Sequence, residues 1–286
     1  MLCAFLCFTG IDSCAKALVQ TLPAFEVVFF RYLGHLIIVS AFFLPSQGLG
    51  LLKANRTKTQ IARATVLLIG TTLNFIAVGY LPLAVTSAIF FLSPLMICAL
   101  SVPFLGERVG LKRWTAILIG FLGVLVIVRP GVGELHWAWM LSLGATLFAS
   151  IYMMLTRVLA GEDTIETSQF YASFIPACAM LPVALWVWVW PQGWVEITLV
   201  CLIGFFGWVG HQFATIAHRM APASTLAPFV YTQILWMTGA GYLFFNTIPD
   251  RWVYVGAVIV IASGLYVWLR ERQLGNVETA LQRPPR

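Results

Sequence analysis

The sequence predicts an all-α membrane protein with ten transmembrane helices, arranged as two inverted five-helix repeats around a central cavity. Three observations support this fold class. The 286 residues are 60% hydrophobic and only 10% charged, whereas a typical soluble domain is about 25% charged. Apolar stretches long enough to span a bilayer recur along nearly the whole chain. The second half of the chain also resembles the first.

Each predicted span is an apolar stretch bounded by glycine, proline or charged residues. The first stretch lacks the basic start and the small-residue cleavage site of a signal peptide, so we expect it to be the first span. The alternating strands of an outer-membrane barrel are not seen in the sequence. The predicted spans are 1–19, 24–44, 63–81, 84–105, 112–128, 137–158, 168–190, 196–217, 223–244 and 252–269.

The distribution of lysine and arginine predicts the orientation in the bilayer. If both termini are cytoplasmic, most basic residues fall in inner connections or the tail, among them Lys53, Arg56 and Arg157, whereas Arg129 and Arg251 lie outside. Inner loops of membrane proteins are enriched in lysine and arginine. We therefore expect a multi-pass protein of the bacterial inner membrane with both termini inside. This asymmetry accounts for the net charge of +6 without a nucleic-acid partner.

The internal similarity predicts how the spans are divided. Residues 84–114 align with residues 223–252 with one gap, which places spans 4 and 5 over spans 9 and 10. Each repeat then has five crossings, and an odd number turns the second copy upside down in the membrane. Inverted repeats are typical of secondary transporters, whose site lies near the midplane between the halves. The predicted units are 1–130, 131–270 and a disordered cytoplasmic tail at 271–286.

The stretch "PLAVTSAIFFLSPLMICALSVPFLGERVGLKRWTAILIGFLGVLVIV" resembles the end of a repeat in EamA-type transporters of the drug/metabolite transporter superfamily. The arginine of "FFRY" and the "TGIDSCAK" segment resemble the family's second and first helices. The second half departs from the pattern, because Gln233 replaces the central proline and "NTIPD" replaces Gly-Glu. The residues that match the family pattern are Pro94, Gly106, Glu107, Gly120 and Gly123.

This resemblance implies a ten-helix bundle that moves small metabolites through a central cavity by alternating access. The family includes exporters of amino acids, aromatic ones among them, as well as importers and nucleotide-sugar exchangers. We therefore expect an exporter of amino acids, including aromatic ones. The alternatives are an importer or exchanger of a nucleotide-like or vitamin-like metabolite, a channel, or an intramembrane enzyme.

Several absent motifs bear on these alternatives. The sequence has no GxxxxGK[ST], HExxH or GxSxG motif, which disfavours nucleotide hydrolysis and common intramembrane chemistry. The six cysteines have no CxxC or Cys/His metal spacing. We expect neither an enzyme nor a bound metal or cofactor. The expected partners are a small-molecule substrate and the lipid bilayer.

Charged residues inside the predicted spans form a candidate network, because an ionised side chain at membrane depth needs a partner. Counting from the turn between the first two spans, Asp12 and Arg31 lie equally deep, and Lys16 and Glu26 nearly so. We expect an Asp12–Arg31 pair, which either fastens the two helices or serves transport directly. His35 then has no carboxylate at its level. It either titrates near neutral pH, with protons as the coupling ion, or is a neutral histidine bonded to a neighbouring helix.

The candidates for the substrate cavity are polar and aromatic residues near the predicted midplane or its outer side. Pro94 and Pro228 interrupt backbone hydrogen bonding in spans 4 and 9 and point to the centre. Aromatic faces would stack on a ring or attract an amino group, and polar groups would orient it. Helix packing is the alternative role for each aromatic residue. The candidates are Asn74, Tyr80, Ser87, Phe90, Phe91, Trp208, His211, Tyr231, Gln233 and Trp236.

Overall fold

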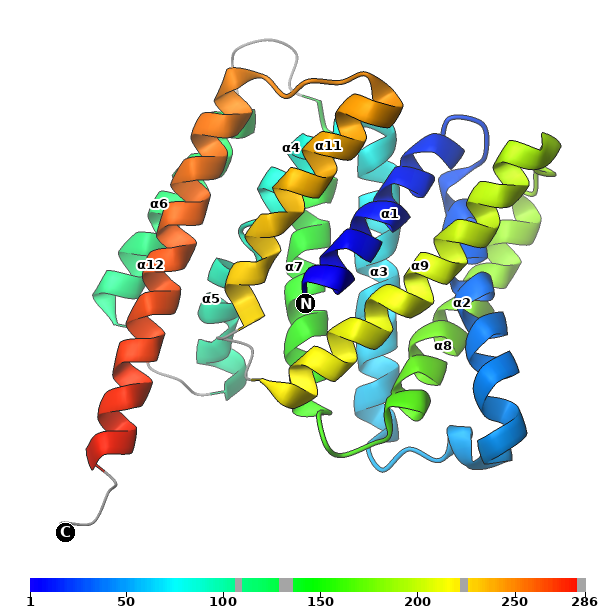
Figure 1. The fold of residues 1–286 in the computed structure, drawn as a ribbon, viewed down its shortest axis with the longest axis horizontal. Coiled ribbons are helices and arrows are strands. Elements are labelled where there is room, and N and C mark those ends of the chain that lie inside the picture. The colour runs from blue at the N-terminus through cyan, green and yellow to red at the C-terminus, as the bar shows by residue number, and fades with distance from the viewer. Residues whose placement is uncertain (106–109, 129–135, 222–225, 282–286) are drawn as a thin grey trace.

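The protein was analysed as a computed structural model that describes residues 1–105, 110–128, 136–221 and 226–281 (Figure 1). The described chain is helical and contains no β-strand. Two short 3-10 helices are η1 (Gly48–Leu52) and η2 (Ala227–Thr232). The α-helices are α1 (Leu2–Leu18), α2 (Ala24–Gln47), α3 (Thr57–Tyr80), α4 (Leu83–Phe90), α5 (Ser93–Leu105), α6 (Leu111–Val128), α7 (Ala138–Val158), α8 (Ile165–Trp186), α9 (Gly193–Met220), α11 (Gln233–Phe245) and α12 (Arg251–Leu281).

The predicted all-α membrane fold is confirmed. Seven candidate membrane spans are found among the described residues by length and apolar character, and Trp114–Ile127 is a shorter apolar helix. Helix α3 begins before the predicted span. In its first two turns Gln60 and Arg63 are buried, whereas Thr57 and Lys58 are exposed. Helix α12 continues to Leu281, beyond the predicted end of the last span at residue 269.

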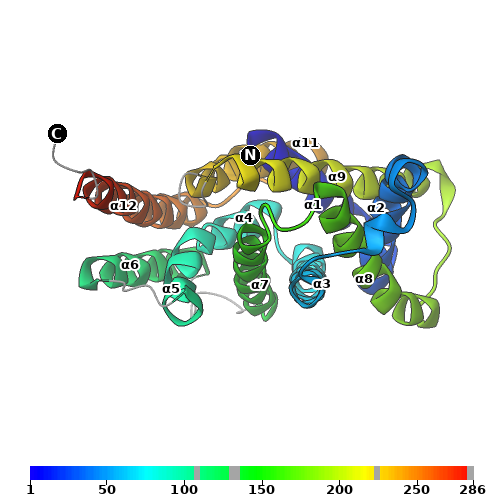
Figure 2. The ribbon, with the colours of Figure 1, turned by 90° about the horizontal axis from the view of Figure 1, so that it is seen from below.

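The helices lie in two layers (Figure 2). One layer contains α12, α11, α1 and α9, and the other contains α6, α5, α7 and α3. The most extensive helix pairings are α1 on α9 and α3 on α7 within the layers, α6 on α12 between them, and α2 on α8. Exchanging the first five helical segments with the last five maps the α1–α9 pair onto the α7–α3 pair. This is the packing that two equivalent halves would give, although the inverted repeat itself stays a prediction.

Two helical segments are interrupted near the middle of the bundle. The predicted span 84–105 breaks at Phe91 and Leu92 into α4 and α5, and Pro94 lies in the first turn of α5. The matching segment of the second half begins with the 3-10 helix η2, whose first turn contains a proline, before α11 starts at Gln233. Proline has no N–H to donate and fits the first turn of a helix, so both breaks follow from the sequence. Discontinuous helices of this kind accompany transporter binding sites.

Helices α2 and α9 cross at a contact between two glycines. A Cβ atom built on Gly204 would lie 2.7 Å from the Cα of Gly34, and one on Gly34 would lie 2.9 Å from the Cα of Gly204. No side chain fits there, which agrees with the close helix contact that small residues permit in membrane proteins. This crossing brings Arg31 of α2 within reach of His211 of α9.

We expect Gly204→Ala to destabilise the protein by about 1–3 kcal/mol, because backbone must move to admit the added methyl group. The matched control is Gly239→Ala in α11, where an added Cβ meets nothing within 4 Å. Thermal unfolding of the two purified variants in detergent measures the difference. Equal unfolding temperatures would contradict the tight crossing.

Candidate functional site

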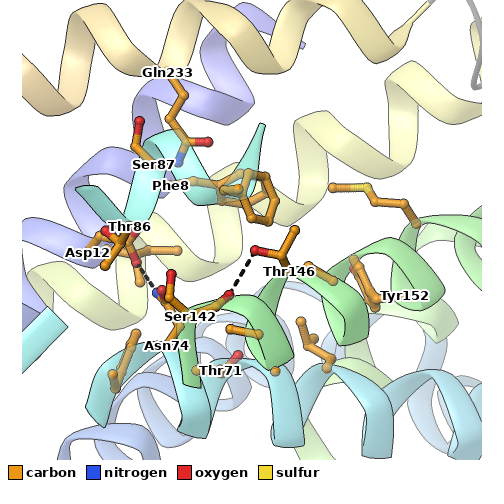
Figure 3. Close-up of a pocket in the computed structure, with 18 of the residues that line it drawn as sticks. Phe8, Asp12, Thr71, Asn74, Thr86, Ser87, Ser142, Thr146, Tyr152 and Gln233 are labelled. Carbon is orange, nitrogen blue, oxygen red and sulfur yellow. Dashed lines mark hydrogen bonds between the residues drawn. The ribbon is translucent and has the colours of Figure 1, made fainter. Parts of the chain in front are cut away.

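A cavity lies between the two layers. The residues that line it belong to α1, α2, α3, α4, α7, α9 and α11. With its open mouth included, it contains about 820 Å³ of empty space. Apolar residues form most of its wall, among them Phe8, Phe75 and Phe90. Polar side chains project into it from several helices (Figure 3). The polar and charged lining residues are Asp12, Arg31, Thr71, Asn74, Thr86, Ser87, Ser142, Thr146, Tyr152, His211 and Gln233.

Asp12 is the acidic group of the cavity. Its Oδ1 accepts a hydrogen bond of 2.8 Å from the Nδ2 of Asn74 on α3 (Figure 3). Within the described part of the chain, no residue donates to its second carboxylate oxygen and no basic side chain lies within ion-pairing distance. An ionised carboxylate at this depth is expensive unless a positive charge joins it. Asp12 is therefore suited to bind a cationic group of a ligand.

Arg31 is the basic group of the cavity and is 2% exposed. Its NH2 donates to the Nε2 of His211 at 2.7 Å, and its guanidinium stacks over the ring of Tyr32 at 4.2 Å from the ring centroid. Its Nε and NH1 have no hydrogen-bond partner. A guanidinium has five N–H donors, and leaving them unpaired inside a protein is costly. The free donors suit a carboxylate or another anionic group.

The expected pairing of charges between the first two spans is wrong. Asp12 bonds to Asn74 and Arg31 bonds to His211, so these two side chains face the same cavity without forming an ion pair. The expectation assumed that the first two helices pack side by side. Instead, α1 packs mainly on α9, and α2 packs on α8 and α9.

Lys16 and Glu26 likewise have separate partners, and neither lines the cavity. The Nζ of Lys16 donates to the carbonyl oxygens of Val78 and Leu81 at 2.8 and 2.9 Å. A cation there satisfies the free carbonyls at the C-terminal end of α3. The Oε2 of Glu26 accepts from the backbone N–H of Val189 at 3.1 Å, which holds the segment between α8 and α9. Both residues have structural roles in the resting protein.

His35 is fully buried and forms a hydrogen bond to a neighbouring helix. This contact was one of the two roles expected for it, the other being titration near neutral pH. Its Nε2 lies 3.0 Å from the Oε1 of Gln169 on α8, and its ring stacks against that of His211 at 6.1 Å. His35 does not line the cavity, whereas His211 does.

Five of the ten predicted cavity residues line the cavity: Asn74, Ser87, Phe90, His211 and Gln233. Ser87 and Gln233 face each other across one edge of it (Figure 3). The Oγ of Ser87 and the Oε1 of Gln233 are buried without a hydrogen-bond partner. Unpaired polar groups in an apolar setting cost free energy, which favours a ligand-binding role for both.

The other five predicted residues do not line it, and their aromatic rings pack against other helices or face outward. Phe91 and Tyr231 pack edge to face at 5.4 Å in a second core cluster, because neighbours such as Phe90 and Phe91 point in different directions on a helix. Trp208 stacks on Phe42 at 5.3 Å. Tyr80 and Trp236 are exposed on the outer surface of the bundle.

A polar face on α7 was not predicted from the sequence. Ser142 and Thr146 line the cavity, and Ser150, one turn further on, bonds to the Oγ of Ser93 at the start of α5. Their spacing of four residues puts small hydroxyls on one face of an otherwise apolar helix, which is a signal readable in the sequence. Tyr152 also lines the cavity, but it is one of many aromatic residues in apolar helices and carries no such signal.

A helical membrane bundle with interrupted helices and a polar, charged cavity between its layers has the architecture of a small-molecule transporter. Residues 1–129 match the EamA-like transporter family. The chain is similar to an S-adenosylmethionine uptake transporter of Rickettsia conorii, with 27% identity over 93% of this chain and 90% of the relative. A riboflavin transporter of Vibrio cholerae is 28% identical over 93% of this chain and 91% of its own. The pseudopaline exporter CntI of Pseudomonas aeruginosa is 27% identical over 90% of each chain.

The match of the first half of the chain to this family, and relatives that are named as transporters of small molecules, support an EamA-type transporter of small metabolites rather than an enzyme. A solved crystal structure shares its fold with a TM-score of 0.67 at 16% sequence identity, covering 95% of this chain and 98% of the other. The predicted family and class of function are therefore confirmed.

Proposed function

We propose that this transporter exports amino acids, aromatic ones included, across the bacterial inner membrane by alternating access. The observation that carries the proposal is the presence in the same cavity of a carboxylate without a basic partner, Asp12, and of a guanidinium with two unpaired nitrogens, Arg31. A zwitterion satisfies both, with its ammonium group at Asp12 and its carboxylate at Arg31. The phenylalanines of the wall suit an aromatic side chain.

One of the relatives supports an amino-acid group as the recognised feature. S-adenosylmethionine, named for the relative from Rickettsia conorii, carries an ammonium and a carboxylate on one carbon. The named relatives include an uptake transporter and an exporter. Import or exchange of a larger nucleotide-like or vitamin-like metabolite is the second candidate, favoured by the riboflavin transporter among the relatives.

The proposed topology places both termini in the cytoplasm. The connections between α2 and α3 and between α7 and α8 lie at the same end of the molecule as the C-terminus (Figure 1). The first of these carries Lys53 and Arg56, as the positive-inside rule requires of a cytoplasmic loop. Protons are the proposed coupling ion.

Flux in proteoliposomes of known orientation tests the function. Labelled L-phenylalanine, L-tryptophan, L-serine, S-adenosylmethionine and riboflavin are each loaded and their exit and entry followed. We expect saturable flux of the aromatic amino acids and acceleration by unlabelled substrate on the opposite side, which separates a carrier from a channel. Flux of riboflavin without flux of any amino acid would contradict the proposal and favour the second candidate.

We expect Asp12→Asn to weaken binding of L-phenylalanine by about 10–100-fold, because one charge-assisted hydrogen bond to the ammonium group contributes roughly 1.5–3 kcal/mol. Asparagine preserves the size of the side chain, and its amide oxygen can still accept from Asn74. Equilibrium binding to the purified protein measures the change. Thr198→Val, on the exposed side of α9, is the control. Unchanged affinity in Asp12→Asn would remove Asp12 from the site.

A further inference from the structure

A continuous chain of four buried side chains connects the cavity to the start of α3. The NH2 of Arg31 lies 2.7 Å from the Nε2 of His211, and the Nδ1 of His211 lies 2.9 Å from the hydroxyl of Tyr152. The NH2 of Arg63 lies 3.0 Å from the same hydroxyl. Each of these four residues is less than 5% exposed. Four helices, α2, α9, α7 and α3, each contribute one member.

The two arginines fix the direction of every bond in this chain. A guanidinium can only donate, so the Nε2 of His211 must accept from Arg31 and carries no hydrogen. The hydrogen of the neutral imidazole is then on Nδ1, and Nδ1 must donate to the oxygen of Tyr152. Arg63 also donates to that oxygen. The phenol oxygen of Tyr152 therefore accepts two hydrogen bonds.

The hydroxyl hydrogen of Tyr152 is not used in either bond. No acceptor for it lies in hydrogen-bond contact among the residues that the structure describes, and Tyr152 lines the cavity. An O–H group whose oxygen accepts from a cation is a stronger donor than an ordinary phenol, because hydrogen bonds in a chain polarise one another. Tyr152 thus keeps a single, oriented donor on a side chain that lines the cavity.

We propose that the Tyr152 hydroxyl and the free Arg31 nitrogens form a subsite for a ligand carboxylate, and that this subsite makes Tyr152 a specificity-determining residue. The inference rests on the proposed function, in which Arg31 binds the carboxylate of the substrate. Both residues present donors only, and His211 has no spare hydrogen because its one N–H is used. A subsite of donors favours a carboxylate, which only accepts, over an amide or an alcohol, which must also donate.

The test combines one substitution in the protein with changes in the ligand and compares their effects on affinity. The full chain is purified as the wild type and as Tyr152→Phe, and Kd is measured for L-phenylalanine, 3-phenylpropionate and L-phenylalaninamide. The first two probes carry a carboxylate, and the third carries the ammonium group without it. We expect Tyr152→Phe to weaken binding of both carboxylates by about tenfold, the effect of one charge-assisted hydrogen bond. Binding of the amide should change less than twofold.

Tyr32→Phe is the matched control. The Tyr32 hydroxyl is also buried, but it donates to the Oγ1 of Thr71 at 2.9 Å and does not line the cavity. We expect its affinities for the three probes to equal those of the wild type. An equal loss for all three probes in Tyr152→Phe, or no loss for the carboxylates, would overturn the inference.

The outcomes also separate this inference from the proposed function. Binding of 3-phenylpropionate without L-phenylalanine contradicts an amino-acid substrate while supporting the carboxylate subsite. Binding of L-phenylalanine with no effect of Tyr152→Phe overturns the subsite alone, and binding of none of the probes overturns both.

Removing the Tyr152 hydroxyl also leaves Arg63 and His211 without their acceptor. A second measurement therefore uses the wild-type Tyr152. Nitrogen-15 NMR of the histidine rings in the wild type reports which ring nitrogen carries hydrogen, and His211→Asn assigns the signal. We expect His211 with hydrogen on Nδ1 only. Hydrogen on Nε2 would mean that His211 does not accept from Arg31, since a guanidinium cannot accept, and would overturn the inference.

Discussion

Replacement of Arg31 by methionine is expected to weaken binding of L-phenylalanine by about 100-fold while leaving the protein at least as stable as the wild type. Two guanidinium nitrogens of Arg31 are buried without a partner. Replacing a poorly paired buried charge by an apolar side chain of similar size is often neutral or stabilising by about 1–4 kcal/mol. The loss of binding follows because a carboxylate would lose its charged partner. Arg31 would then lower the stability of the folded protein while providing substrate binding.

Two measurements on one preparation check this result. Binding is followed by titration calorimetry, and stability by thermal unfolding in the same detergent. Lys53→Met is the control for loss of a positive charge, because Lys53 is exposed outside the cavity. A large fall in the unfolding temperature of Arg31→Met would mean that Arg31 is mainly structural. Retained affinity would remove it from the substrate site.

The opposite result is expected for Arg63, the second buried arginine. Its Nε donates to the Oγ1 of Thr156 at 3.0 Å and its NH1 to the Oε1 of Gln60 at 3.2 Å. Its NH2 donates to Tyr152, so all three guanidinium nitrogens are bonded. Arg63→Met should destabilise the protein by on the order of 3 kcal/mol, since several hydrogen bonds of about 1 kcal/mol each are lost.

Arg56→Met provides the matched comparison for Arg63→Met. Arg56 precedes α3 and forms an ion pair of 3.2 Å with Glu162, in which both side chains are more than 40% exposed. Exposed ion pairs contribute about 0–1 kcal/mol. The unfolding temperatures of the two variants should therefore differ clearly. If Arg63→Met unfolds no earlier than Arg56→Met, the buried hydrogen bonds of Arg63 add little to stability.

Of the two buried arginines, Arg31 was recognised from the sequence and Arg63 was not. Arg31 stood out because a charge inside an apolar span requires an explanation. Arg63, the first residue of the predicted span 63–81, did not stand out, because a charge at the edge of an apolar stretch normally faces water. In the structure α3 begins at Thr57, and the side chains of α7 and α8 cover Arg63 completely. Only partners from distant parts of the chain made its burial possible.

The residues that line the cavity were likewise predictable only in part: the polar ones could be predicted from the sequence, and the aromatic ones could not. Polar residues in apolar spans, such as Asn74 and Gln233, were found because an unpaired amide is costly in hydrocarbon. Aromatic residues gave no comparable signal, because a ring packs as well between helices as around a ligand. Tyr152 was missed and Phe91 was wrongly expected for this reason. Which way a ring points depends on helix rotation, and helix rotation is set by the neighbouring helices.

The sequence by itself determined the membrane class, the helical segments and the breaks at the prolines of spans 4 and 9. These features follow from local properties: the cost of exposed backbone in lipid, the length of apolar runs and the missing N–H of proline. The tertiary structure alone decided that Asp12 bonds to Asn74 and Arg31 to His211. Partner choice depends on which helices touch, and α1 packs on α9 rather than along its neighbour in sequence.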